Sequence, residues 1–134
     1  SEISSLFEPL QLPCGKTLKN RIAKSAMSDS LGDGEGRPTD AQIQLYETWA
    51  TGGVGLSLIG EVQVSPYFPE APGNLVLLDD QDRISRLRRL AEAAGKEGSM
   101  LWPQLGHAGA MACADQRTRR AQAGLRVAAS RPVK

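Results

Sequence analysis

The sequence predicts an α/β fold built on a parallel sheet. Short apolar runs alternate with two segments of helical periodicity, and each run follows the preceding helix after a very short link, as in βαβ units. The run at residues 54–59 is apolar almost throughout, which is the form expected of a strand covered on both faces. Right-handed crossovers between such strands make the sheet parallel.

A small hairpin is expected over residues 10–18. Two short extended pieces flank Gly15, which supplies the permissive backbone that a tight turn needs. A strand is expected next over residues 21–27. The turn-rich residues 28–37 then predict a long loop, whose glycines are not followed by the Lys-Ser/Thr ending of a phosphate-binding loop.

A first helix is predicted to begin after Thr39, its expected N-cap. Gln42 stands three residues later, as a capping box requires. Gly52 and Gly53 are expected to end this helix, and the strand over residues 54–59 follows at once. The helix has one apolar face, whose residues are Ile43, Tyr46 and Ala50.

Residues 61–78 contain prolines and a glycine that predict a long, irregular active-site loop. A second helix is predicted from Asp80 to near Gly98, with one apolar stripe and a solvated cationic face. The arginines expected on that face are Arg83, Arg86, Arg88 and Arg89. Residues 100–105 predict a third strand, with Pro103 expected at a strand end because it lacks an N–H group. Trp49 and Trp102 are expected to pack in the core.

Composition indicates a soluble globular protein. Hydrophobic residues make up 40% of the 134 positions, and no apolar run approaches the length of a membrane helix. Cys14 and Cys113 lie far apart without an apolar signal segment, which favours reduced thiols and a cytoplasmic location. His107 is the single histidine, so no metal cluster or paired-histidine clamp is expected, and a local structural role is the simpler interpretation.

The last twenty residues differ from the rest in charge. Residues 115–134 carry six basic side chains and one acidic, whereas residues 1–114 carry 10 basic and 14 acidic. No aromatic residue accompanies these arginines, so stacking on bases is excluded and no nucleic-acid partner is expected. A disordered tail, or a frameshift in the gene, is the hypothesis for this change.

Six short blocks resemble, in order and spacing, the start of old yellow enzyme flavoproteins. They are LFEPL at 6–10, LKNRI at 18–22, SAMS at 25–28, PTD at 38–40, GGVG at 52–55 and QLGHAG at 104–109. The resemblance implies the N-terminal part of a (β/α)₈ TIM barrel, a hairpin plus about three βα units, in which the hairpin caps the barrel floor. It implies FMN as cofactor, NAD(P)H as hydride donor and an ene-reductase type of reaction.

The same resemblance assigns residues to the flavin. Ser25, Ala26 and Met27 are expected against the ring through their backbone, with the hydroxyl of Ser28 donating to flavin O4. Further contacts are expected from three more positions, Glu61, Val62 and Gln104. Glu61 and Val62 border the ring by their backbone, where Val62 is expected to crowd it slightly. Gln104 uses its carboxamide on the pyrimidine edge.

His107 is expected at the substrate or in the layer behind it. The family usually has Arg where this chain has Ala110. No catalytic residue is assigned.

The expected organisation is a barrel portion over residues 1–112 and a divergent basic tail over 113–134. A closed barrel needs roughly 250 residues, so the chain is expected to be too short for the whole enzyme and its barrel incomplete. The expected partners are FMN and a small-molecule substrate, without nucleic acid or membrane. The alternative is a catalytically inactive, flavin-free fragment that self-associates as a homo-oligomer through an exposed strand edge.

Overall fold

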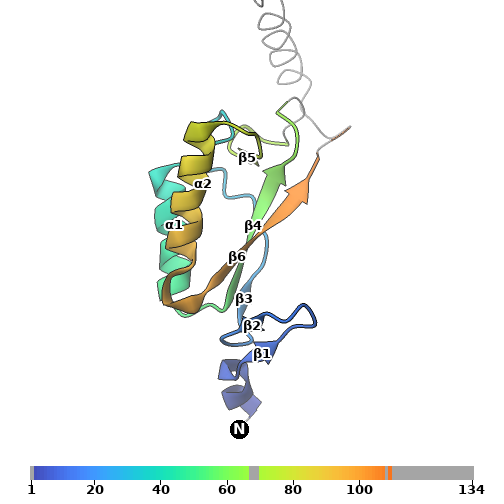
Figure 1. The fold of residues 1–134 in the computed structure, drawn as a ribbon, viewed down its shortest axis with the longest axis vertical. Helices are drawn as coiled ribbons and strands as arrows, with labels where there is room; N and C mark the ends of the chain where they lie inside the picture. The colour runs from blue at the N-terminus through green and yellow to red at the C-terminus, as the bar shows by residue number, and fades with distance from the viewer. Residues whose placement is uncertain (1, 67–69, 108, 110–134) are drawn as a thin grey trace, which may run out of the picture.

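Strand β4 (Leu56–Gln63) is the centre of a parallel sheet in the computed structural model, which describes residues 2–66, 70–107 and 109. Along one edge it pairs with β3 (Ala23–Lys24) and further on with β5 (Leu75–Val76), and along the other edge with β6 (Met100–Gly106). The helices α1 (Asp40–Thr51) and α2 (Gln81–Ala94) lie together on one face of this sheet (Figure 1). The predicted parallel α/β architecture is confirmed.

The hairpin forms where it was predicted. Strands β1 (Leu10–Gln11) and β2 (Thr17–Leu18) pair antiparallel, and Gly15 in the turn has a φ of 83°, which favours glycine. A 3₁₀ helix, η1 (Glu2–Phe7), precedes it and was not predicted. Hairpin and η1 lie at the amino ends of the parallel strands (Figure 1).

Thr39 is the N-cap of α1, as predicted, because its hydroxyl oxygen accepts a hydrogen bond from the Gln42 backbone N–H at 3.3 Å. The reciprocal half of the capping box is absent. The Gln42 side chain is only 2% exposed and instead donates to both carboxylate oxygens of Asp29, at 3.0 Å each. The expected capping box is therefore wrong in that half, because the buried Gln42 side chain binds the Asp29 carboxylate instead of the backbone N–H.

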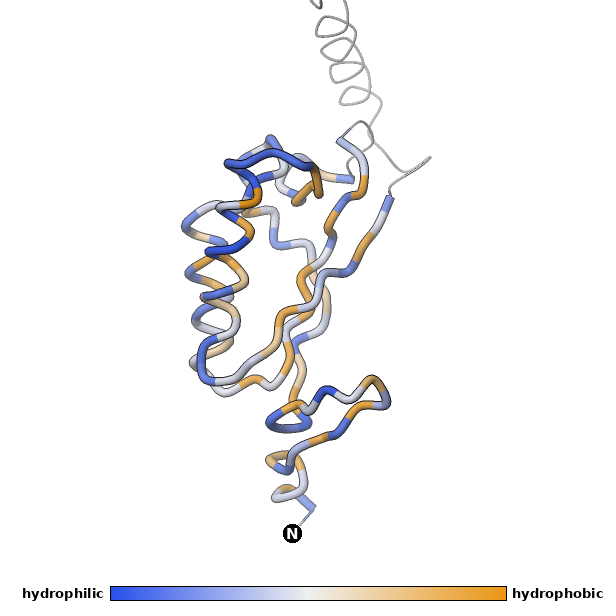
Figure 2. The backbone as a smooth tube through the Cα atoms, viewed as in Figure 1, coloured by the Kyte–Doolittle hydropathy of each residue, from blue (hydrophilic) through white to orange (hydrophobic). Residues whose placement is uncertain are grey.

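The core lies between β4 and the two helices. Its buried members are Tyr46, Ile59, Val62, Leu75, Leu90 and Ala94. Figure 2 shows hydrophobic stretches along the sheet and on the helices beside it. Neither α1 nor α2, nor any other helix in the described part of the chain, has the length and hydropathy that crossing a lipid bilayer requires.

The connection predicted to be irregular over residues 61–78 contains more sheet than expected. Strand β4 continues through Gln63, and β5 adds two residues beside it. Pro103 lies inside β6 rather than at its end, opposite Ile59, where the register between β4 and β6 shifts. This irregularity accommodates a residue that cannot donate a ladder hydrogen bond.

Both tryptophans were assigned to the core, and this is wrong for the described chain. Trp49 is 41% exposed and Trp102 is 39% exposed, because each stands beside a sheet edge or face that no described residue covers. The short 3₁₀ helix η2 (Lys96–Gly98) follows α2, so the second helix ends at Ala94 instead of near Gly98. Cys14 is exposed, while Cys113 and the basic tail lie outside the described residues.

Arg83 corrects the expectation of a fully solvated cationic face on α2. It is 7% exposed and donates hydrogen bonds to the carbonyl oxygens of Val76 and Glu35, each at 3.1 Å, and to the Asp80 carboxylate at 2.8 Å. One guanidinium thus joins β5, the loop before α1 and the start of α2.

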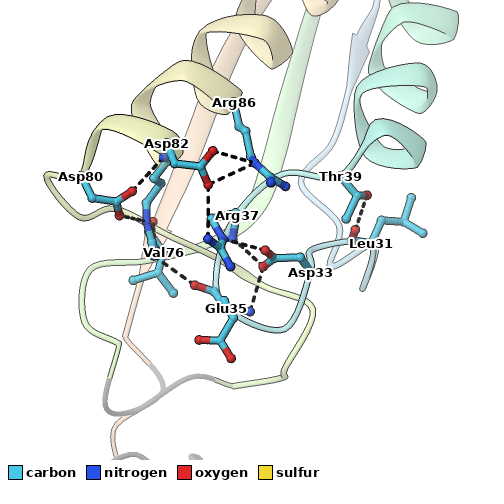
Figure 3. Close-up of polar contacts among 10 residues, drawn as sticks. Leu31, Asp33, Glu35, Arg37, Thr39, Val76, Asp80, Asp82 and Arg86 are labelled. Carbon is cyan, nitrogen blue, oxygen red and sulfur yellow. Dashed lines mark hydrogen bonds and ion pairs between the residues drawn. The ribbon is translucent and has the colours of Figure 1, made fainter. Parts of the chain in front are cut away.

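A neighbouring ion-pair network connects the same loop to α2 through the Arg37–Asp82 contact, with one further pair inside the loop and one inside the helix. Arg37 contacts Asp33 at 2.7 Å and Asp82 at 3.2 Å, and Arg86 contacts Asp82 at 3.3 Å (Figure 3). Charged hydrogen bonds therefore contribute to holding the polar loop over residues 28–38 in place, together with the backbone bonds of Gly32 and Gly36 to Gly73 and Val76.

We predict that Arg83→Met lowers the free energy of unfolding by roughly 2 kcal/mol, because buried carbonyl acceptors lose their donor while the aliphatic stem is kept. Urea denaturation followed by circular dichroism measures this change. Arg88→Met, at an exposed position of the same helix, is the control and is expected to have a much smaller effect. Equal losses in the two variants would contradict the anchoring role.

Candidate functional site

The carboxyl ends of the parallel strands bring the predicted site residues to one edge of the sheet. Strand β3 leads directly into residues 25–28, an irregular segment called the turn below, and Ser28 forms a parallel bridge with Gly60 of β4. Glu61 and Val62 follow Gly60 in the same strand, and Gln104 lies on the adjacent strand β6. Figure 1 shows these strand ends pointing to the same side of the fold, away from the hairpin.

Gly60 is the point at which the turn and Gln104 meet. A Cβ atom placed on Gly60 would stand 2.6 Å from Oε1 of Gln104, 3.0 Å from Cβ of Ala26 and 3.4 Å from the backbone N of Met27. A side chain at this position would therefore collide with both segments. The sheet brings together the two places to which the sequence assigned the flavin, and it does so over a residue without a side chain.

Side chains around Gly60 differ in exposure. Ala26 is half-buried, whereas Ser25, Met27, Ser28 and Gln104 are exposed. The open carboxamide of Gln104 carries one donor and one acceptor on a short, planar group. The surface therefore consists of backbone and small side chains, together with the exposed thioether of Met27 and one exposed amide.

Val62 does not crowd this surface. Its side chain is 2% exposed and packs in the core with Ile59 and Leu75. The register shift between Ile59 and Val62 turns that side chain toward the helices. The expected crowding by Val62 is wrong, although its backbone remains at the strand end.

Ser28 is connected to a polar chain of residues. Its hydroxyl donates to Oδ1 of Asn74 at 2.7 Å, and Nδ2 of Asn74 donates to the Glu70 carboxylate at 3.4 Å. Asn74 is 4% exposed and lies immediately before β5. The orientation of the Ser28 hydroxyl is thus set by a buried amide.

Glu61 forms the other end of this chain. A hydrogen bond with the Glu70 carboxyl raises the pKa of Glu61, and burial and the charge of Glu70 act in the same direction. The side-chain contact with Gln63 opposes this rise, since Nε2 of Gln63 donates to Oε2 of Glu61 at 3.3 Å. Two interacting carboxyl groups therefore lie at the carboxyl end of β4, and their contact favours the protonated form of Glu61.

His107 lies just beyond β6 and is exposed. Its Nδ1 accepts a hydrogen bond from the Gly109 backbone N–H at 3.0 Å, which is a local contact within the loop. In the described ranges, no three His, Cys, Asp or Glu side chains are grouped as metal ligands. The role of His107 at a substrate stays a prediction.

Sequence reasoning missed Gly60, Asn74 and Glu70. A signal existed for Gly60, because a glycine inside an apolar strand marks a bulge or a close approach of another group. No comparable signal exists for Asn74 and Glu70, which reach the site only through the path of the long connection after β4.

The chain is similar to flavoenzymes along most of its length. The model of the NADH:flavin oxidoreductase / NADH oxidase family matches residues 5–133. The chain belongs to this family. It is 30% identical to the NADH-dependent flavin oxidoreductase iliE of Hypocrea jecorina over 104 residues, covering 75% of the chain and 26% of the relative. It is 34% identical to the 4,4'-dithiodibutanoate disulfide reductase of Rhodococcus erythropolis, covering 81% of the chain and 26% of the relative.

Solved structures show the same fold. The old yellow enzyme of Trypanosoma cruzi superposes with a TM-score of 0.76 at 24% identity, covering 87% of the chain and 30% of that structure. The old yellow enzyme homologue of Zymomonas mobilis gives a TM-score of 0.75 at 21% identity, covering 85% and 31%. The predicted α/β portion of a TIM barrel is therefore confirmed, and the chain spans about a quarter to a third of these proteins.

A groove of about 750 Å³ lies away from the strand ends, along the outer edge of β3 and α1. Its apolar lining includes Ile22, Leu45, Trp49 and Val54. In a closed eight-stranded barrel this edge of the first strand is covered by the last strand–helix unit. We therefore assign the groove to barrel packing rather than to the candidate site.

The Glu61–Glu70 pair predicts a pH-dependent stability. The raised pKa means that the folded chain holds this proton more tightly than the unfolded chain. The stabilisation is complete below the ordinary value of 4.5 and is lost as pH rises through the raised value. Glu61→Gln keeps a neutral hydrogen-bonding group at every pH, so its melting temperature relative to the parent chain should rise between about pH 4 and about pH 7.

Scanning calorimetry across this pH range provides the measurement. Glu92→Gln, at an exposed position of α2, is the matched control and should give a flat difference. A flat difference for Glu61→Gln as well would show that the contact between the two carboxyl groups does not favour the protonated form of Glu61.

Proposed function

We propose that this chain forms the ring-side wall of an FMN site in an NAD(P)H-dependent oxidoreductase of the ene-reductase type. Ser25, Ala26 and Met27 lie against the ring through their backbone, and Gln104 bonds its pyrimidine edge. The backbone of Glu61 and Val62 borders the same ring. The observation that carries the proposal is the convergence of Ala26, Met27 and Gln104 over Gly60.

The residues present fit a flat heterocycle. Because Gly60 has no side chain, Ala26 and the Gln104 carboxamide pack directly over the strand backbone, and no side chain of β4 protrudes between them toward a ring. Gln104 offers a donor and an acceptor from one planar group, which matches the alternating acceptor and N–H groups of a pyrimidine edge. A ring system needs both the bare backbone at Gly60 and the planar carboxamide of Gln104. Core packing does not need them, because this surface is exposed.

Ser28 has a more restricted role than its hydroxyl alone suggests. Its proton is directed to Oδ1 of Asn74, so its oxygen has only lone pairs available for another partner. The donation to flavin O4 expected from the resemblance therefore requires release from Asn74. In the present arrangement the Ser28 hydroxyl donates to Asn74, and toward a bound flavin it would serve only as an acceptor.

The chemistry belongs to the cofactor: when bound, FMN accepts hydride from a reduced nicotinamide and passes it to a second substrate. The chain's own residues bind and orient the ring, and the buried side of β4 excludes water behind it. The iliE relative is named as NADH-dependent, which favours NADH as the donor. The named relatives include a disulfide reductase, so the resemblance alone does not select an activated alkene as the acceptor.

FMN titration of the ¹³C,¹⁵N-labelled chain tests the proposal. We expect FMN to shift the resonances of Ala26, Met27, Gly60 and the Gln104 side-chain amide. Gln104→Leu should weaken binding roughly tenfold, because two hydrogen bonds are lost. Binding to the chain alone is expected to be weak and to be lost on gel filtration, since the chain spans 30% of the Trypanosoma cruzi structure.

Gln44→Leu, at an exposed position of α1, is the control and should leave the affinity unchanged. Shifts confined to other parts of the chain would contradict the proposed site. A flavin-free oligomer that shows no shifts at any concentration would instead support the alternative of a self-associating fragment.

A further inference from the structure

Lys24 is a buried cation directly behind the candidate site. It is 7% exposed and lies in β3, immediately before the turn over residues 25–28. Its ammonium donates to the carbonyl oxygens of Ser25 and Leu58, each at 2.9 Å, and to the hydroxyl of Tyr46 at 3.3 Å. The three protons of the ammonium thus have three acceptors, as a buried charge requires.

The two carbonyls belong to neighbouring strands at the site. Ser25 begins the turn, and Leu58 lies two residues before Gly60 in β4. A single positive charge that binds both oxygens fixes the distance between the turn and the strand that faces it. The Tyr46 ring, whose centroid is 5.0 Å from the ammonium nitrogen, supports the same group from α1.

The other end of the turn is also held by α1. Asp29, which follows Ser28, accepts hydrogen bonds on both carboxylate oxygens from Nε2 of Gln42 at 3.0 Å. Gln42 and Tyr46 are four residues apart on the helix, so they stand one above the other on the same face. Both are buried, with exposed fractions of 2% and 0%.

We propose that Lys24 is a positioning residue, which together with the Gln42–Asp29 contact holds the turn over residues 25–28 in place opposite Gly60. The consequence for FMN rests on the function proposed above, whereas the positioning itself does not. An apolar residue at position 24 would fill the same space but could not bind two carbonyl oxygens at once.

The protonation state of Lys24 provides a way to test this role. Two titratable groups face its ammonium, Tyr46 from α1 and Asp29 beyond the turn. Burial lowers the pKa of Lys24, with the charge of Asp29 opposing, and burial raises the pKa of Tyr46. Lys24 therefore loses its proton before Tyr46 does. The neutral amine keeps two protons for the two carbonyl oxygens, and its lone pair accepts from the Tyr46 hydroxyl, but the positive charge that strengthens both carbonyl contacts is lost.

The free energy of unfolding, by contrast, is expected to rise with pH over this range. A lysine whose pKa is lower in the folded chain favours folding more as pH rises from that value toward the ordinary 10.5. A change in the turn over the same range therefore reports local repositioning rather than the onset of unfolding.

Carbon-detected NMR of the ¹³C-labelled chain, titrated with base, is the experiment, because carbon signals survive fast amide exchange. We expect Cε of Lys24, the methyl groups of Ala26 and Met27, and Cα of Gly60 to shift together, with one midpoint below 10.5. Carbons of the hairpin over residues 10–18 should not follow this transition. In Lys24→Arg the guanidinium stays charged, so the turn carbons should show no transition.

Turn carbons that stay unchanged while Lys24 titrates, or that shift equally in Lys24→Arg, would overturn the proposal. The base titration uses the unsubstituted chain, so the test remains valid even if the Lys24 variants do not fold. FMN titration adds a second arm, in which Lys24→Met weakens binding and Lys24→Arg restores part of it. Absence of FMN binding in every variant, with the carbon transition intact, would reject the proposed function and leave the positioning role standing.

Discussion

At Gly60, strand β4 passes so close to Ala26 and to the carboxamide of Gln104 that a side chain at this position would have to displace them. This close packing is possible because β3 and β6 pair with opposite edges of β4 and run parallel to it. The carboxyl ends of the strands therefore deliver a turn, a bare backbone and an amide to one exposed surface. The proposed flavin site is a consequence of that arrangement.

Buried cations hold this arrangement to the helices. Lys24 binds carbonyl oxygens from the turn after β3 and from β4 against Tyr46 of α1, and Arg83 of α2 binds carbonyl oxygens from β5 and from the loop at Glu35. Both charges are satisfied by hydrogen bonds, so their removal would leave buried acceptors without donors. The segments at the carboxyl ends carry few apolar side chains of their own, and charged contacts supply the order that packing does not.

Local patterns in the sequence were sufficient for the hairpin, both helices, the parallel sheet and the N-cap at Thr39, because turn chemistry and periodicity act over a few residues. They were insufficient for the burial of Arg83, the position of Val62 and the second partner of Gln42. Each of these depends on a contact across the fold or on the register shift in β4. The resemblance to the flavoenzyme family supplied the candidate ring contacts. Gly60 carried a sequence signal that shows only a close approach, without the partner, and Asn74 reaches Ser28 only through a contact across the fold.

The central claim is that the turn over residues 25–28 and the side chain of Gln104 meet at Gly60. Nuclear Overhauser effects in the labelled, flavin-free chain measure this directly. The structure predicts cross-peaks from the α protons of Gly60 to both the Ala26 methyl group and the Gln104 side-chain amide protons. Cross-peaks from Gly60 to neither group, in a chain whose Leu10–Leu18 hairpin contacts are intact, would contradict the account.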